Sequence, residues 1–249
     1  MKKFLPSLLF LLLLSFNALA QLSTSPDVFT TPEGDLTVYA VNHGSVAFTF
    51  GDKTILVDPY GGAELFSEFN APDIIFITDI HGDHLNAGTL DGLDTENTTF
   101  VVPQAVADQM DEMYQNQLVI IGNDESTELH GIKASAIPMY NLPDDESARH
   151  IKGRGNGYIL TFGEMNVYLS GDTEDIPEMR ALTNIDIAFV CMNLPYTMDI
   201  NQAASAVLEF KPAVMYPYHH RGQDIEAFKK LIIDKNKNID VRLKNWYFN

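Results

Sequence analysis

Four side chains that can bind a metal ion or move a proton lie within six residues of one another: Asp79, His81, Asp83 and His84. They directly follow the apolar run 73–78, which is typical of a buried strand with a functional loop at its carboxyl end. Side chains two apart in an extended chain point the same way, so Asp79 and His81 can face one metal ion. If the chain then turns, Asp83 and His84 can face a second. Imidazole and carboxylate ligands suit zinc, iron or manganese; the plain alternative is a polar loop with two incidental histidines.

Three more candidate ligands stand beside other expected strands. Asp172 follows the strand expected at 166–170, and His219 follows the strand expected at 213–216. His150 precedes a glycine-marked strand. Asp or His at several separate strand ends indicates a site that is built on loops over a rigid sheet.

The elements that must position these residues are short strands alternating with helices. Apolar or alternating runs bounded by Gly, Pro, Asn and Asp predict the strands, and apolar residues at three- and four-residue spacing predict helices. The expected strands are 36–41, 45–50, 54–57, 73–78, 99–102, 118–121, 132–138, 157–162, 166–170, 186–190, 213–216 and 241–243; the expected helices are 61–69, 104–114, 201–210 and 224–233. This pattern fits an α/β fold in which two mixed β-sheets pack together with helices outside.

Composition excludes several classes of protein. The 249 residues include 34 acidic and 16 basic side chains, which gives a formal net charge of −18. A chain this acidic is a poor binder of nucleic acid, because phosphate contacts need Lys and Arg. The single cysteine, Cys191, excludes an intramolecular disulfide and a cysteine-rich zinc ribbon, and it is expected to be buried.

The first twenty residues are expected to be a signal peptide. Two lysines precede an apolar run, and Ala18-Leu19-Ala20 supplies the small-x-small pattern that a signal peptidase cleaves. An uncleaved membrane anchor is the alternative. We therefore expect residues 21–249 to form a single domain in the periplasm or outside the cell, with no stable membrane association after cleavage.

The motifs together resemble the metallo-β-lactamase superfamily of metal-dependent hydrolases, over nearly the whole span from His43-Gly44-Ser45 to Pro217-Tyr218-His219. The chain looks similar to the branch that includes L-ascorbate-6-phosphate lactonase-like proteins. The family's first motif is His-x-His-x-Asp-His, and here Asp79 stands in place of its first histidine. The resemblance implies an αβ/βα sandwich of two mixed β-sheets flanked by helices.

The resemblance also implies two divalent metal ions. These are zinc, or else manganese or iron. One ion would be held by Asp79, His81 and His150, the other by Asp83, His84 and His219, with Asp172 bridging them. Asn141 is the alternative to His150.

Asp79 would change the charge of such a site. Three carboxylates and a bridging hydroxide would neutralise two divalent ions, whereas a histidine at position 79 would leave one positive charge. We expect Asp79 to shift the preference from zinc toward manganese or iron, or to weaken the first metal site.

The function implied is an exported hydrolase whose metal-bound hydroxide cleaves a small ester, lactone or phosphodiester. Asp83 or Asp172 would orient the hydroxide and pass on a proton. His43, Tyr196 and Arg149 are candidates for contacting a small, anionic substrate. A β-lactam hydrolase and a non-catalytic binding protein with a lost metal site are the alternatives.

The roles of Asp58 and of a basic cluster around His150 remain open. Asp58 either holds a ligand histidine by a hydrogen bond or simply ends a strand. The cluster of Arg149, Lys152 and Arg154 either binds an anion or is a solvated loop. His220 is expected to face solvent.

Overall fold

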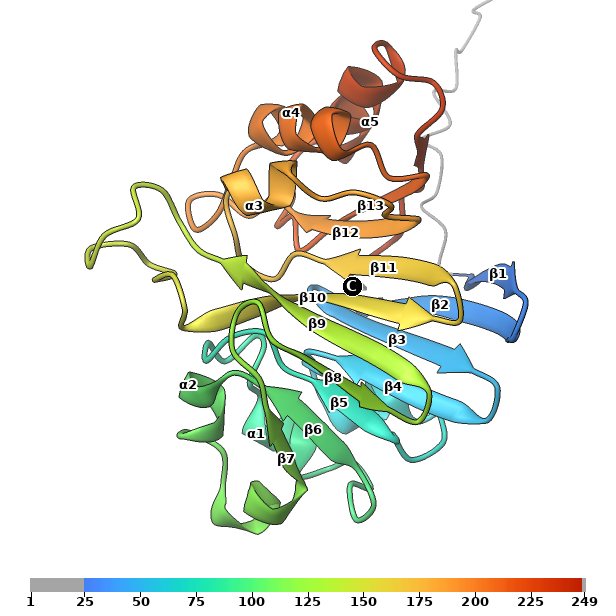
Figure 1. Cartoon of the computed structure of the whole chain (residues 1–249), viewed down its shortest axis with the longest axis vertical. Coiled ribbons are helices and arrows are strands. Elements are labelled where there is room, and N and C mark those ends of the chain that lie inside the picture. The colour runs from blue at the N-terminus through green and yellow to red at the C-terminus, as the bar shows by residue number, and fades with distance from the viewer. Residues whose placement is uncertain (1–24, 248–249) are drawn as a thin grey trace, which may run out of the picture.

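Two seven-stranded mixed β-sheets pack face to face in this protein, as expected (Figure 1). The structure is a computed structural model and describes residues 25–247, so the expected signal peptide lies outside the described residues. Among the described residues no helix is both long and apolar enough to cross a membrane.

The first sheet is built from the first half of the chain, in sequence order. It contains β1 (Asp27–Thr31), β2 (Gly34–Asn42), β3 (Ser45–Phe50), β4 (Lys53–Val57), β5 (Ile74–Phe76), β6 (Thr99–Val102) and β7 (Leu118–Ile120). Strands β1 to β4 pair antiparallel, and β4 to β7 pair parallel. The parallel strands therefore end at one edge of the sheet.

The second sheet follows the same plan with the second half of the chain. It contains β8 (Ser126–Leu129), β9 (Ile132–Met139), β10 (Gly155–Phe162), β11 (Met165–Leu169), β12 (Ile187–Cys191), β13 (Val214–Tyr218) and β14 (Asp240–Val241). Strands β8 to β11 pair antiparallel, and β11 to β14 pair parallel.

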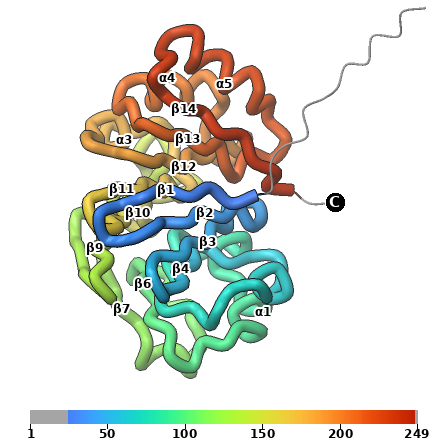
Figure 2. The backbone as a smooth tube through the Cα atoms, turned by 90° about the vertical axis from the view of Figure 1, so that its right-hand side faces the viewer, coloured from blue at the N-terminus to red at the C-terminus, as the bar shows by residue number. Residues whose placement is uncertain are grey.

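Helices cover the outer face of each sheet, and the two halves are stacked on each other (Figure 2). The first sheet carries α1 (Ala87–Leu90), α2 (Gln104–Ala107) and the 3₁₀ turns Ala63–Phe66 and Glu112–Gln117; the second carries α3 (Pro177–Arg180), α4 (Ile200–Phe210) and α5 (Ile225–Ile233). Helix α4 starts with a capping box formed by Asp199 and Gln202, and it buries Ala203, Val207 and Phe210.

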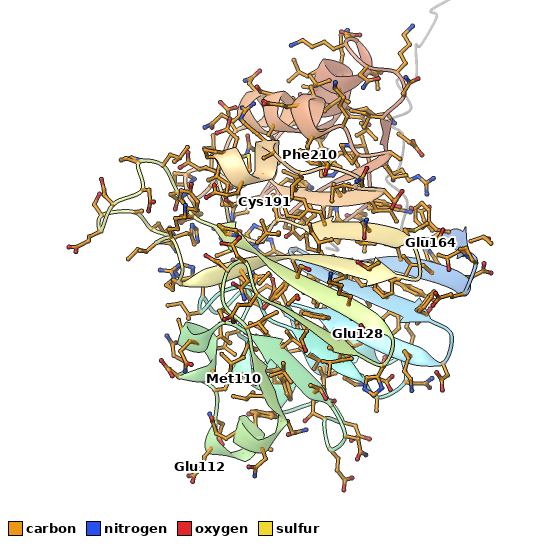
Figure 3. All side chains as sticks on the ribbon, in the orientation of Figure 1. Met110, Glu112, Glu128, Glu164, Cys191 and Phe210 are labelled. Carbon is orange, nitrogen blue, oxygen red and sulfur yellow. The ribbon has the colours of Figure 1, made fainter. Side chains whose placement is uncertain are left out.

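The period-two alternation of the strands divides the core into two layers. On β3, Val46 and Phe48 pack between the sheets, whereas Ala47 points to the outer helices. Cys191 at the end of β12 is buried as expected, near α3 in Figure 3, and burial raises the pKa of its thiol to about 12. The single thiol is thus a core side chain.

Several elements differ from the sequence-based expectation. Strands β1 and β8 were not expected; each lies at or near a sheet edge, and exposed residues dilute its apolar pattern. The helices expected at 61–69 and 104–114 are single turns, and the last strand is 240–241.

Candidate metal centre

The candidate ligands gather where the parallel strands end, at one edge of the sandwich. Residues 79–84 follow β5, Asp172 follows β11, and His219 follows β13. The backbone there leaves little room: a Cβ on Gly44 would come within 2.7 Å of the His219 ring. Gly171, with φ of 60°, makes the turn that presents Asp172.

Three buried imidazoles point an unpaired nitrogen at the same carboxylate. The Nε2 atoms of His84, His150 and His219 are buried and make no hydrogen bond within the described residues. They lie 3.5, 3.3 and 3.5 Å from the carboxylate oxygens of Asp172. Buried polar atoms are almost always satisfied, so three unpaired nitrogens around one carboxylate fit a bound cation.

The opposite nitrogen of each ring is held by a partner behind it. His84 Nδ1 lies 2.8 Å from Asp58 Oδ2, and His150 Nδ1 lies 2.8 Å from Asn141 Oδ1. These partners orient each ring and leave Nε2 free for a metal, as supporting groups in metal sites do. Asp58 thus contacts a candidate ligand, and Asn141 lies behind His150.

Asn193 supports the third ring in the same way. Its amide nitrogen is placed 2.9 Å from His219 Nδ1, and its buried Oδ1 has no hydrogen-bond partner among the described residues. An imidazole that binds metal through Nε2 carries its proton on Nδ1 and must donate it. The amide oxygen is then the better acceptor, and the amide NH₂ turns toward the cavity. Asn193 lies three residues after the expected strand 186–190, so its position near a strand end could have been noticed in the sequence.

Asp172 is ionised in this setting. Burial raises the pKa of its carboxyl group, but the imidazoles of His219 and His84 outweigh that effect and hold the pKa well below its ordinary value. Burial lowers the pKa of His84, but Asp58 and Asp172 raise it well above 6.5. A metal ion held by His84 would have to displace a proton from it, so its affinity would fall in acid.

The remaining candidates form two flanking groups. Asp79, His81 and His150 make one cluster, with His81 Nδ1 2.6 Å from Asp79 Oδ2. Asp83, His219 and His43 make the other cluster. Asp83 Oδ2 lies 3.5 Å from His219 Nε2 and 3.1 Å from His43 Nε2. All seven candidate ligands are thus brought to one place.

Asp79 also has a partner that the sequence analysis did not pair with it. Arg154 Nε lies 3.1 Å from Asp79 Oδ1, and Arg154 Nη2 lies 3.0 Å from Oδ2. Burial raises the pKa of the Asp79 carboxyl group, and hydrogen bonding to His81 together with the charges of His84 and Arg154 brings it well below its ordinary value. The negative charge that Asp79 adds to the site is therefore offset by Arg154.

The basic cluster separates into three environments. Arg154 pairs with Asp79, Lys152 forms an ion pair with Glu178 at 2.6 Å, and Arg149 stacks over the Tyr196 ring at 4.3 Å. The cluster is therefore neither one anion site nor one solvated loop.

His43 lies beside the candidate ligands. Its Nδ1 is 3.0 Å from the hydroxyl of Tyr247, and burial lowers the pKa of its imidazole more than Asp83 raises it.

His220 was expected to face solvent, and this was wrong. Its side chain is buried against Tyr247, and burial lowers its pKa to about 4.

A cavity of about 270 Å³ opens directly onto the centre. It is lined by Tyr60, His81, Asp83, Arg149, Asp172, Asn193, Tyr196 and Arg221. Tyr196 and Arg149, two of the expected substrate contacts, line this cavity, and His43, the third, lines a second, adjoining cavity of about 620 Å³. Arg221 was missed by sequence reasoning, because a basic residue after two histidines carries no distinctive signal.

Comparison with known proteins agrees with this geometry. The family model of the β-lactamase superfamily domain matches residues 37–219. The UPF0173 metal-dependent hydrolase of Thermococcus onnurineus is 30% identical over 217 residues, covering 80% of this chain and 94% of the relative. That of Pyrococcus horikoshii is 29% identical over 208 residues, covering 77% and 91%.

Solved structures show the same fold. A Parabacteroides distasonis protein that carries the name of a metal-dependent hydrolase matches with a TM-score of 0.81 and 35% identity, over 90% of this chain and 100% of that one. The metallo-β-lactamase fold protein YhfI of Bacillus subtilis, 14% identical over 83% and 90% of the two chains, matches with a TM-score of 0.61 and shows the fold alone. The chain belongs to the metallo-β-lactamase superfamily and is a metal-dependent hydrolase of the UPF0173 group.

Proposed function

We propose that this hydrolase uses two divalent metal ions to cleave a small, anionic ester, lactone or phosphodiester. One observation carries the proposal: three buried, unpaired imidazole nitrogens surround the ionised Asp172. A buried arrangement of this kind is costly unless a cation completes it.

The ligands divide into two sets that share Asp172. Asp79, His81 and His150 would hold one ion, and Asp83, His84 and His219 would hold the other. Asp172 lies within 3.5 Å of His84, His150 and His219, so it contacts members of both sets. Nitrogen and carboxylate donors in this proportion suit zinc, manganese or iron.

Divalent ions held by these residues would lower the pKa of water and polarise the oxygen atom under attack. Two side chains of the protein, Asp83 and Asn193, can orient the attacking water and the substrate. Burial raises the pKa of Asp83, but His219 and His43 lower it far more, so this carboxylate is ionised at neutral pH. It lines the cavity and can accept a hydrogen bond that orients an attacking water. The Asn193 amide can donate to an oxygen of the substrate from the cavity wall.

The test combines metal analysis with an activity panel. Protein purified without added metal or chelator is assayed for metal per chain and for hydrolysis of nitrophenyl esters, lactones, bis(4-nitrophenyl) phosphate and nitrocefin. Two ions per chain together with ester, lactone or phosphodiester cleavage support the proposal. One ion per chain contradicts the two-metal centre, and cleavage of nitrocefin alone favours the β-lactam hydrolase.

Two finer statements are part of the proposal. The resemblance to L-ascorbate-6-phosphate lactonase-like proteins makes a sugar-phosphate lactone one substrate to include in the panel. Residues 1–20 are proposed to direct export to the periplasm or the outside of the cell. Fractionation of the native cells and the intact mass of the mature protein test the export: a mass that begins at Met1 contradicts it.

A further inference from the structure

Two of the five arginines differ from the others in their partners. Arg154, Arg180 and Arg242 each form an ion pair with an aspartate. Within residues 25–247, Arg149 and Arg221 form no ion pair with a carboxylate, although acidic residues outnumber basic ones by 34 to 16. These two guanidinium groups are therefore free to bind another anion.

The same two arginines converge on one aromatic ring. The guanidinium carbon of Arg149 lies 4.3 Å from the centre of the Tyr196 ring, and that of Arg221 lies 5.5 Å from it. Stacking on a ring face fixes a guanidinium group but leaves its N–H edges free to donate hydrogen bonds. We call Arg149, Tyr196 and Arg221 the arginine rim.

The arginine rim lies on the cavity that leads to the metal centre. All three of its residues line the 270 Å³ cavity, together with Asp83 and Asp172. They come from three loops: Arg149 from the long loop between β9 and β10, Tyr196 from the loop after β12, and Arg221 from the loop after β13 (Figure 1). A ligand in this cavity can contact the arginines and the candidate metal ligands at once.

The backbone of the rim is anchored by residues that also support the centre. Arg154 binds Asp79 and also donates from Nη1 to the carbonyl oxygen of Arg149 at 2.8 Å. Asn141 holds His150 and donates to the carbonyl oxygen of Tyr196 at 2.9 Å.

The third anchor is Tyr247. Its hydroxyl contacts His43, which in turn contacts the candidate ligand Asp83, and it accepts a hydrogen bond from the backbone N–H of Arg221 at 2.7 Å. Each residue of the arginine rim is thus tied to one support of the metal centre. These shared supports link the rim to the centre, as substrate recognition beside a reacting bond requires.

We propose that Arg149 and Arg221 bind an anionic group of the substrate, a phosphoryl or carboxylate group that is separate from the bond being cleaved. This inference rests on the proposed function and names its substrate class. In a protein of net charge −18, two unpaired guanidinium groups at the cavity supply the positive charge that such a substrate needs.

The test compares three 4-nitrophenyl esters that share a leaving group: the acetate, which is neutral, the monosuccinate, which adds a carboxylate, and the phosphonoacetate, which adds a phosphonate. The enzyme should cleave at least one charged ester more efficiently than the acetate, and the better charged ester identifies the anion. In the double variant Arg149→Ala/Arg221→Ala this preference in kcat/KM should fall by about tenfold for each arginine, since each charged hydrogen bond contributes about that much. Cleavage of the acetate should fall by less than cleavage of the charged ester, because the acetate carries no anionic group for the arginines to bind.

The control is Lys235→Ala/Lys237→Ala, which makes the same change in net charge at exposed positions outside the cavity lining. It should keep the preference for the charged ester. Equal cleavage of charged and neutral esters by the unsubstituted enzyme, or equal behaviour of the two double variants, overturns the arginine rim as an anion site and leaves the hydrolase proposal intact.

Calorimetric titration with phenylphosphonate separates the two proposals when turnover fails. If none of the esters or the other panel substrates is cleaved, the proposed function is contradicted. Binding that the Arg149→Ala/Arg221→Ala variant loses still supports the anion site, whereas binding that is unchanged in this variant overturns it.

Discussion

The guanidinium group of Arg154 donates one hydrogen bond to each carboxylate oxygen of Asp79, across 75 residues of sequence. The resemblance to the superfamily motif implies that Asp79 stands where the first histidine of that motif is expected. An aspartate paired with an arginine carries no net charge, and neither does a neutral imidazole. The pair therefore offsets the charge that Asp79 alone would add, which weakens the expectation that Asp79 by itself shifts the metal preference.

Removal of Arg154 should strengthen metal binding beside Asp79. In Arg154→Met the buried carboxylate loses its cationic partner, so a divalent ion becomes its main source of compensation. We expect manganese affinity to rise by about tenfold, while the metal-free protein loses about 3 kcal/mol of unfolding free energy. Competition with a fluorescent chelator and urea unfolding in EDTA measure the two effects. Arg154→Lys keeps the charge and serves as the control; unchanged manganese affinity in Arg154→Met would contradict the pairing argument.

Asp79 and Arg154 should behave as one energetic unit. Asp79→His leaves Arg154 beside an imidazole and without a carboxylate, so we expect the metal-free single variant to be less stable. Adding Arg154→Gln should recover at least half of that loss. A double-mutant cycle from urea unfolding in EDTA gives the coupling, which we expect at about 2 kcal/mol. Additive effects of the two substitutions would show that the pair contributes no coupling.

Asp58 should matter for metal binding without being a ligand. Its Oδ1 accepts from the backbone N–H of Thr78, and its Oδ2 orients His84. Asp58→Asn cannot accept in the same way on both sides, so metal affinity should fall about 10- to 100-fold. Metal competition titrations measure the change. The exposed Asp144, changed to Asn, provides a matched control, and equal affinities in the two variants would rule out the supporting role.

Asp27 should stabilise the fold in a pH-dependent way. It forms hydrogen bonds with Lys244 Nζ at 2.8 Å and Tyr216 at 2.5 Å. Burial raises the pKa of Asp27, but the hydrogen bonds with Lys244 and Tyr216 lower it by more than burial raises it. The pKa therefore lies below the ordinary value of 3.8. A lowered carboxyl pKa contributes stability that is present above the unfolded-state pKa and is lost as the pH falls through the folded-state value.

Asp27→Asn should therefore lower the unfolding free energy by about 1 kcal/mol at neutral pH. The difference from the unsubstituted protein should shrink as the pH falls below 3.8. Urea unfolding in EDTA across this range measures it, with the exposed Glu33→Gln as the control. A difference that stays constant with pH would show that the charge of Asp27 is not its source.

Local pattern fitted the class of fold and singled out the candidate ligands, and the resemblance to a known superfamily supplied the sandwich and the division of the ligands into two sets. Period-two alternation predicted most central strands, because each strand buries one or both faces. The residues that follow β5, β11 and β13 were found because strand ends are local features and parallel strands end at one edge. The edge strands β1 and β8 were missed because exposed residues weaken their apolar pattern.

The partners of the ligands were decided only by the tertiary structure. Three contacts show this, because each joins loops that are far apart in the chain. They are Arg154 with Asp79, His43 with Tyr247, and His220 with Tyr247. The sequence by itself determined the donor groups and the strands that carry them, since these depend on residue type and local spacing. The packing of the two sheets decided which side chains face each other across the site, because such contacts depend on the relative placement of several loops and no local periodicity encodes that placement.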